Sequence, residues 1–287
     1  MEIKKVGVVG AGTMGSGIAQ IAAQIGCQVV MRDIESSFVD RGIAGIEKFL
    51  SKGIEKGKLD SVEKDKILGR ITGTTDMSML EDVDLAIEVV IEDLALKKKV
   101  FKELDDLCRS EVIIASNTSS MSITEIAAAT KRPDKVCGMH FFNPVPLMKL
   151  VEIIRGHETS DETVDSATGL ARKMGKITVE VKKDSPGFIV NRIMIPHMLE
   201  AIKIVEEGIA TIEDVDTAVK NGLNYPMGPF ELMDLTGIDI AYFVTEYFYK
   251  ELNKESKWVS PNLLKTMIRA GKLGRKTGGG WYDFGNR

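Results

Sequence analysis

His140 and Glu152 carry the side chains that proton transfer at neutral pH requires. His140 ends the apolar run Val136–Met139, and Glu152 lies in the segment KLVEIIRG with apolar residues on both sides. A carboxylate in such a segment is costly to bury without a partner. A nearby imidazole would supply that partner, and the carboxylate would fix its tautomer and raise its basicity. The pair therefore predicts general acid–base chemistry, with a purely structural pair as the alternative.

Short polar side chains follow another apolar segment of the chain. Ser116-Asn117-Thr118-Ser119-Ser120 comes directly after Val112–Ala115. Open α/β sheets bind their ligands at the carboxyl ends of strands, so we expect these side chains to reach a cofactor and a substrate. Helix capping is the alternative, because Ser122, with Glu125 three residues on, makes a capping box. Both interpretations can hold, since they concern different serines.

The stretch VGVVGAGTMGSGIAQ, residues 6–20, predicts the element that places a cofactor beside these groups. It has an apolar strand pattern, a turn with the spacing G-x-G-x-x-G, and a helix pattern. A second strand pattern, QVVMRD, ends in an acid about 20 residues further on, as in dinucleotide-binding folds. The helix N-terminus would present free N–H groups to the phosphates. We therefore expect the cofactor to contact the turn residues Gly10, Gly12, Thr13, Met14 and Gly15.

The acid at the end of the second strand pattern decides between the two nicotinamide cofactors. Asp33 would accept hydrogen bonds from the adenosine ribose, and its carboxylate repels a 2′-phosphate, which predicts NAD. Arg32 precedes it and softens this preference. NADP therefore stays open as the less favoured cofactor.

The composition of the chain is that of an ordinary globular protein. It has 287 residues, of which 44% are hydrophobic and 28% are charged, and this length favours two domains. The net charge of −4 gives no reason to expect nucleic-acid binding, and no apolar run approaches the ~20 residues that span a membrane. The first strand pattern starts at once, so we expect no signal peptide. Three scattered cysteines lack metal-ligand spacing, which predicts no bound metal, reduced thiols and a cytoplasmic location.

The order of apolar runs indicates an α/β fold followed by a helical region. Strand-like runs alternate with helical stretches, which predicts a Rossmann-type, mostly parallel sheet domain at residues 1–184. After this point the periodicity becomes helical, which predicts an all-α C-terminal domain at residues 185–287. We expect this domain to dimerise because of its excess of apolar residues, and the family resemblance given below implies that it also contributes to substrate binding. The strand-like runs are Val6–Val9, Gln28–Met31, Leu85–Val90, Val112–Ala115, Val136–Met139, Lys149–Ile154 and Ile177–Val181. The helical stretches of the second domain are Phe188–Glu207, Ile212–Asn221, Pro229–Leu235 and Ile238–Lys250.

A charged segment interrupts the α/β pattern at about residues 37–68. Its apolar residues recur at helical spacing, which predicts a long helix, a turn near Gly57 and a second helix. Lys48, Lys52 and Lys56 sit four residues apart and share one helix face. This lysine stripe would suit the phosphates of an extended ligand. A solvated helix surface with interleaved acidic residues is the alternative.

Segments spread over the whole chain form a pattern of their own. They are GAGTMGSGIAQ, EVVIEDLALKKKVF, ASNTSS, MHFFNPVPLMKLVEII, DSPGFIVNRI and GRKTGGGWYDF. In this order they resemble the short-chain L-3-hydroxyacyl-CoA dehydrogenase family, most closely its bacterial 3-hydroxybutyryl-CoA dehydrogenases, with no departure at a motif position. The resemblance implies an NAD-dependent enzyme of fatty-acid and butanoate metabolism that interconverts (S)-3-hydroxybutyryl-CoA and acetoacetyl-CoA. It also implies a homodimer formed through the C-terminal domain.

The same resemblance implies roles for single residues. His140 matches the family's catalytic base and Glu152 its acidic partner. Ser119 and Asn191 match the polar residues that bind the reacting part of the substrate. The lysine stripe matches the segment that contacts coenzyme A, which favours Lys52 first and Lys56 second. Positions that match the family's NAD site are Asp33, Glu92, Lys97, Asn117, Asn143 and Lys276.

Two other classes of protein stay open. A Rossmann oxidoreductase of a free hydroxy acid or sugar acid would share the nucleotide fingerprint but would need no lysine stripe. Turnover of acetoacetyl-CoA compared with acetoacetate separates this class. A non-catalytic binding protein would keep the fold and usually lose part of the active constellation, whereas here His140, Glu152, Ser119 and Asn191 are all present.

Overall fold

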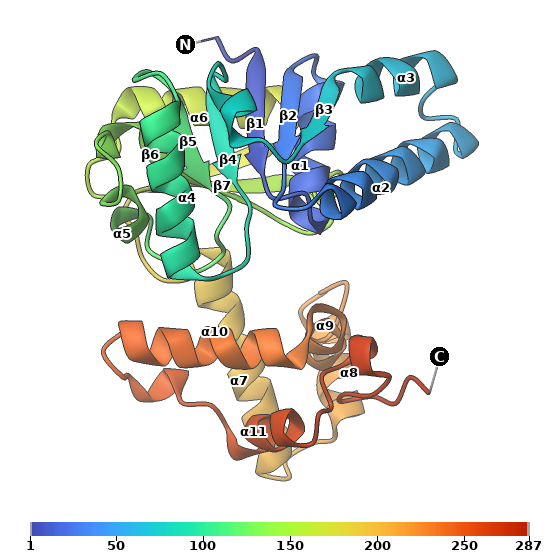
Figure 1. Ribbon diagram of the computed structural model, residues 1–287. Helices are drawn as coiled ribbons and strands as arrows, with labels where there is room; N and C mark the ends of the chain where they lie inside the picture. The colour runs from blue at the N-terminus through green and yellow to red at the C-terminus, as the bar shows by residue number, and fades with distance from the viewer. Residues whose placement is uncertain (1, 286–287) are drawn as a thin grey trace. The chain divides into compact units, whose positions relative to one another are not determined.

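A computed structural model describes residues 2–285 of the chain (Figure 1). The chain divides into two compact units, with the division between Phe188 and Ile189. The first unit contains a β-sheet covered by helices, and the second is built from helices. The α/β class with a following all-α region, as predicted from the sequence, is confirmed.

An eight-stranded sheet forms the centre of the first unit, in the order β3-β2-β1-β4-β5-β6-β7-β8. Neighbouring strands are parallel except β6 and β7, which are antiparallel. The strand order reverses between β1 and β4, and ligands of open α/β sheets bind at the carboxyl end of such a switch point. The strands are β1 (Lys5–Val9), β2 (Gln28–Arg32), β3 (Ile71–Thr74), β4 (Leu85–Glu88), β5 (Ile113–Ser116), β6 (Val136–Phe141), β7 (Leu150–Arg155) and β8 (Ile177–Val181).

Side chains of each central strand alternate between two apolar cores. Val6 and Val8 of β1 join one core, whereas Val9 joins the other, because successive strand residues point to opposite faces of the sheet. Strands buried on both faces read as unbroken apolar runs, which is why their patterns are clear in the sequence. The first core includes α1 (Thr13–Gln24), α2 (Ser36–Glu55), α3 (Ser61–Gly69) and α6 (Asp161–Lys173), and the second includes α4 (Leu94–Leu107) and α5 (Ile123–Ala127).

The charged segment forms the helices α2 and α3, joined by a turn in which Gly57 has a φ of 64°. The short edge strand β3 follows α3. Its sequence, ITGT, has one large apolar side chain and no fully buried residue, so it lacks the apolar run that marks the other strands. In Figure 1 the two helices lie beside the β3 edge of the sheet.

The second unit has a core of its own, in which Phe230, Phe248 and Trp258 are buried. The C-terminal tail folds back onto it, because the carboxylate of Asp234 accepts the backbone N–H groups of Trp281 and Tyr282. None of the helices in residues 2–285 is long and apolar enough to cross a membrane. The helices of this unit are α7 (Val190–Glu206), α8 (Ile212–Gly222), α9 (Pro229–Thr236), α10 (Ile238–Glu251) and α11 (Asn262–Arg269).

Candidate active site

The glycine-rich turn connects β1 with α1 and has no room for side chains at two of its glycines. Gly10 has a φ of 117°, which favours glycine. A Cβ at Gly15 would lie 1.8 Å from the carbonyl oxygen of Gly10, so only glycine lets α1 pack against the turn. A Cβ at Gly12 would meet no heavy atom within 4 Å. Gly12 therefore borders the open space that a pyrophosphate requires.

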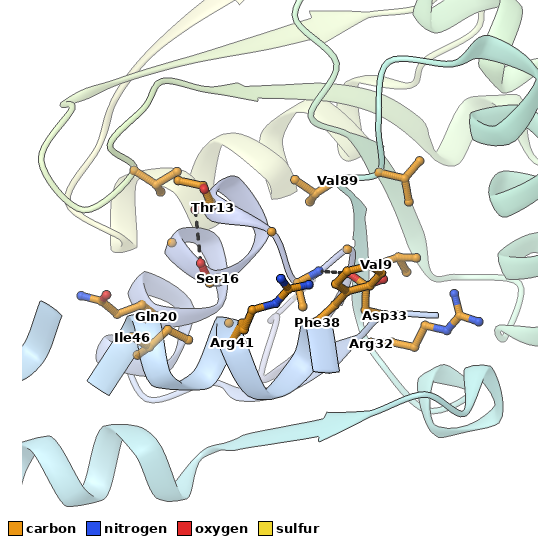
Figure 2. Close-up of a pocket in the computed structure, with 18 of the residues that line it drawn as sticks. Val9, Thr13, Ser16, Gln20, Arg32, Asp33, Phe38, Arg41, Ile46 and Val89 are labelled. Atoms are coloured by element: carbon orange, nitrogen blue, oxygen red, sulfur yellow. Dashed lines mark hydrogen bonds between the residues drawn. The ribbon is translucent and has the colours of Figure 1, made fainter. Parts of the chain in front are cut away.

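A pocket of about 720 Å³ opens over this turn (Figure 2). Gly10, Gly12 and Thr13 line it. The N-cap of α1 is Gly12, which has no side chain to cap the helix, so the first N–H groups remain for an anion. Met14 packs instead against the apolar core, and Gly15 packs against the turn. The residues present thus fit the phosphates of a dinucleotide.

Asp33 lies just after β2 and lines the same pocket. Its carboxylate accepts the N–H of Ala11 at 2.7 Å and the N–H of Ile34 at 2.7 Å. These bonds fix the carboxylate beside the glycine turn, and its other lone pairs remain for ribose hydroxyls. Arg32 also lines the pocket, with its Nε donating to a backbone oxygen. In the view of Figure 2 these two residues lie at the opposite end from Gln20.

One face of α2 forms a wall of the pocket. Arg41, Ile46 and Phe49 line it, because residues three or four apart on a helix share a face. Lys52 and Lys56 continue this face beyond Phe49. Both lysines are exposed, and neither forms an ion pair with another described residue. Asn143, which precedes a cis proline, lines the pocket from the segment after β6.

His140 and Glu152 face each other across the antiparallel strands β6 and β7, where they are direct register partners. The Nδ1 atom of His140 lies 2.7 Å from Oε2 of Glu152. The two side chains are only 7% and 0% exposed. The rings of Phe142 and Phe188 flank the imidazole, with centroids at 4.4 and 5.7 Å. Since Nδ1 is engaged by the carboxylate, Nε2 is the nitrogen that can exchange a proton with a substrate.

An ion-pair network, buried at Glu88 and Lys97 and exposed at Glu92, joins the carboxyl ends of β4 and β5. Lys97 donates to Glu88 at 2.9 Å and lies 3.2 Å from Glu92. Glu92 accepts the hydroxyl of Thr118 at 3.0 Å and the N–H of Ser119 at 2.8 Å. The structure therefore brings together three residues that the sequence resemblance assigned to the site, namely Glu92, Lys97 and Ser119.

Asn117 links this network to the histidine strand. Its Oδ1 accepts the N–H of Phe141 at 2.9 Å, directly after His140 in the chain. Because β4, β5 and β6 are parallel neighbours, their carboxyl ends lie at the edge of the sheet that carries the glycine turn. The glycine turn and the pair of His140 and Glu152 therefore lie at the same edge of the sheet.

The sequence argument missed Glu88, and it did not predict that Ser116 and Thr118, which it expected near the ligands, bind the acids of this network. Ser116 donates from its hydroxyl to Glu88 Oε2 at 2.7 Å. The signal for Glu88 was present, because it is an acid at the end of the apolar strand LAIE, the same kind of pattern that pointed to Glu152. Glu88 and Ser116 meet as register partners of β4 and β5, and Lys97 reaches them from α4, neither of which the sequence alone shows.

The helix-capping alternative concerned Ser122, and the structure confirms it. Ser122 is the N-cap of α5 and accepts the N–H of Glu125 at 3.1 Å. The Glu125 carboxylate binds Lys98 at 2.6 Å, so the capping box is only half formed.

Asn191 and Lys276 belong to the second unit. Asn191 lies half-buried in the first turn of α7. Lys276 binds the carboxylate of Asp239, with its Nζ at 2.5 and 2.7 Å from the two oxygens. The roles predicted for these two residues stay predictions.

Comparison with known proteins assigns both units to the same protein family. The NAD binding domain of 3-hydroxyacyl-CoA dehydrogenase matches residues 5–185, and the C-terminal domain of that enzyme matches residues 187–284. A 3-hydroxybutyryl-CoA dehydrogenase of Clostridioides difficile is 48% identical over 98% of this chain and 99% of its own. A probable 3-hydroxybutyryl-CoA dehydrogenase of Deinococcus radiodurans is 48% identical over 98% of this chain and 100% of its own. The crystal structure of (S)-3-hydroxybutyryl-CoA dehydrogenase PaaH1 from Ralstonia eutropha has a TM-score of 0.96 and 46% identity, over 99% of this chain and 100% of that one.

Proposed function

The chain belongs to the 3-hydroxyacyl-CoA dehydrogenase family and is an NAD-dependent oxidoreductase, and from this premise we propose that it interconverts (S)-3-hydroxybutyryl-CoA and acetoacetyl-CoA. The observation that carries the proposal is the buried contact between His140 and Glu152 at the edge of the sheet that holds the dinucleotide turn. Relatives named for this reaction support the choice of substrate.

Proton transfer is the part of the reaction that this chain would perform itself. When bound, NAD supplies the hydride acceptor or donor. In the direction of oxidation, Nε2 of His140 takes the proton of the substrate's C3 hydroxyl. In the direction of reduction, the imidazolium returns it to the forming alkoxide. The carboxylate of Glu152 stabilises the imidazolium in both directions, because it is buried against Nδ1 at 2.7 Å.

Ser119 and Asn191 are proposed to bind the reacting part of the substrate. Ser119 follows β5 at the same edge of the sheet as His140, and its N–H is fixed by Glu92. Asn191 has the matching family position in the first turn of α7. For the cofactor we propose contacts from Asp33, Asn143 and the glycine turn, which line one pocket. Glu92, Lys97, Asn117 and Lys276 remain proposals from the family resemblance.

Lys52 and Lys56 are proposed to bind the phosphates of coenzyme A. They extend the face of α2 that lines the pocket, they are exposed, and no described acid neutralises them. A cationic surface next to an apolar wall suits a long ligand with phosphates at one end. The solvated-surface alternative predicts that these lysines have no effect on substrate affinity.

A homodimer formed through the C-terminal helices is also proposed. The helices of this unit carry exposed apolar side chains, including Leu235 of α9 and Ile240 and Phe243 of α10, which are 50%, 50% and 62% exposed. Joined in one contiguous patch, such side chains would form an interaction surface. A second copy of the chain is the partner that the family resemblance implies.

The direct test of the proposed reaction follows the absorbance of reduced nicotinamide. Purified protein is mixed with NADH and either acetoacetyl-CoA or free acetoacetate, and then with NADPH in place of NADH. We expect turnover of acetoacetyl-CoA with kcat/KM at least ~10²-fold above that for acetoacetate, because binding of the coenzyme A portion would be used to reach the transition state. Equal turnover of acetoacetate would favour a free-acid dehydrogenase. A higher kcat/KM with NADPH would contradict the preference for NAD.

A further inference from the structure

We propose that Glu88 is a positioning residue, which acts through Lys97 to hold Glu92 and Ser119 in their working geometry. The proposal rests on the proposed function, since that function gives Glu92 and Ser119 their roles. Glu88 itself does not line the pocket, and its effect passes through the groups it binds, Lys97 and the N–H of Val90, of which Val90 does line the pocket.

Glu88 is the last residue of β4 and is 0% exposed. Its Oε1 accepts the N–H of Val90 at 2.7 Å and Nζ of Lys97 at 2.9 Å. Its Oε2 accepts the hydroxyl of Ser116 at 2.7 Å. Charge-assisted hydrogen bonds of this kind are short and directional. The carboxylate therefore ties together the end of β4, the end of β5 and the start of α4.

Lys97 connects Glu88 with Glu92, which lies on the exposed side of the site. Its side chain is 1% exposed, and its ammonium contacts Glu88, Glu92 and the backbone oxygen of Val90 at 3.3 Å. An ammonium has three donors, and these contacts use them. Val90 is thus bound at its N–H by Glu88 and at its oxygen by Lys97. The segment 89–91, which lines the pocket, is held from behind by the pair.

Glu92 differs from Glu88 because its side chain is 42% exposed. Its position depends on Lys97 and on the hydroxyl of Thr118 and N–H of Ser119. If Glu88 loses its charge, the buried ammonium keeps only Glu92 as a counter-ion, and both groups shift. A misplacement of about 1 Å in a site can cost ~10²-fold in rate. Glu88 therefore determines the positions of Glu92 and Ser119.

The test compares Glu88→Gln with the native full-length chain. Glutamine keeps the shape of the side chain and removes its charge. The Kd for NADH is measured by fluorescence titration. KM and kcat are measured with acetoacetyl-CoA as the substrate, and Tm is measured by thermal unfolding. We expect the Kd for NADH to rise ~10-fold and kcat/KM to fall by at least as much, within the range for a displaced site. Ser116→Ala, which removes one donor to Glu88, should move the Kd in the same direction by a smaller factor.

Asp105→Asn is the matched control for a purely structural effect. Asp105 lies near the other end of α4 and accepts Nε of Arg132 at 2.7 Å, so it is also a buried carboxylate with a cation. Its substitution should lower Tm without changing the Kd for NADH. If Glu88→Gln lowers Tm and leaves the Kd as unchanged as Asp105→Asn does, the positioning role is wrong.

A double variant, Glu88→Gln/Lys97→Met, covers the case in which the single variant does not fold. It removes both charges from the interior, and such replacements are often tolerated, but Glu92 then lacks its cation. We expect a folded chain that still binds NADH ~10-fold more weakly. Native NADH affinity in this variant would overturn the proposal. A native chain that fails to reduce acetoacetyl-CoA would contradict the proposed function. The comparison of NADH affinities would still test the positioning role, because NADH binding needs no acyl-CoA.

Discussion

The imidazole of His140 is held from one side by the carboxylate of Glu152, with almost no solvent around either group. A carboxylate in a water-poor place is far more effective at stabilising an imidazolium than one at the surface. The same contact leaves Nε2 as the ring nitrogen that can meet a substrate. In the proposed reaction, burial and hydrogen bonding together are what would let this common pair of residue types give and take a proton.

The buried thiol of Cys108 makes the free energy of unfolding depend on pH. Burial raises the pKa of the Cys108 thiol from 9.0 to about 11, and its Sγ donates to the backbone oxygen of Leu80 at 3.3 Å. Between these two values the unfolded chain loses the thiol proton and the folded chain keeps it. The stabilisation is complete below pH 9.0 and is lost as pH rises through about 11, by at most roughly 3 kcal/mol.

Cys108→Ala tests this dependence. The free energy of unfolding of the native chain, measured by urea denaturation, should fall more steeply over this pH window than that of the variant. The comparison needs only the difference between the slopes, so the cost of the lost side chain at lower pH does not disturb it. Equal slopes would show that Cys108 does not carry the effect.

At the level of elements, the strands that were easiest to predict are those with apolar side chains on both faces, such as β1 and β5. The edge strand β3 was missed, because none of its four residues is fully buried and Ile71 is its only large apolar side chain. Site residues show the same division. Glycine spacing and acids inside apolar strands are visible in the sequence, whereas the meeting of Glu88, Lys97 and Ser116 depends on strand register.

Two glycines of the turn after β1 should respond to alanine in opposite ways. Gly12 has a φ of −67°, which alanine adopts, and its Cβ meets no protein atom within 4 Å. Gly12→Ala should therefore fold with a nearly native Tm and bind NADH at least ~10-fold more weakly, because the methyl group enters the pyrophosphate space. Gly15→Ala should be destabilised by more than ~1–3 kcal/mol, since its Cβ would lie 1.8 Å from a backbone oxygen. Thermal unfolding and NADH titration measure both, and normal NADH affinity in Gly12→Ala would contradict the pocket assignment.

The lysines of α2 give a second prediction at this level. Lys52→Glu should raise the KM for acetoacetyl-CoA by roughly 10-fold, because it replaces attraction to a phosphate by repulsion, with a smaller change in the KM for NADH. Lys66→Glu on α3 is the matched control, with the same change of charge at an exposed lysine outside the pocket lining. Equal effects on both KM values would indicate a folding defect. If Lys66→Glu raises the KM for acetoacetyl-CoA as much as Lys52→Glu does, the effect comes from the overall charge of the surface and not from a phosphate contact at Lys52.

The whole molecule consists of two units with separate apolar cores. The sequence showed this organisation as a change in periodicity, from strands alternating with helices to helices alone. It did not show how two copies of the chain would meet, because a surface patch is assembled from several helices. The exposed apolar side chains of α9 and α10 are a structural observation that supports the proposed homodimer.

Phe243→Asp tests the homodimer. Phe243 is 62% exposed on α10, so a charge there costs the folded monomer little, but it would be buried in an interface of the proposed kind. Sedimentation velocity should show the native chain as a dimer and the variant shifted towards monomer. The control is Ile177→Asp, at a 60% exposed site in β8. Phe38→Asp would not serve as a control, because Phe38 lines the pocket. A native chain that sediments as a monomer would contradict the proposal.

The rate of acetoacetyl-CoA reduction by a His140→Gln variant, with NADH in excess, tests the central claim most directly. Glutamine keeps a polar side chain beside Glu152 but cannot give a proton to the forming alkoxide. The account predicts that kcat falls by ~10²–10⁴-fold, the usual contribution of a general acid–base group, while the Kd for NADH stays native. A kcat close to that of the native chain would contradict the assignment of His140 as the proton donor.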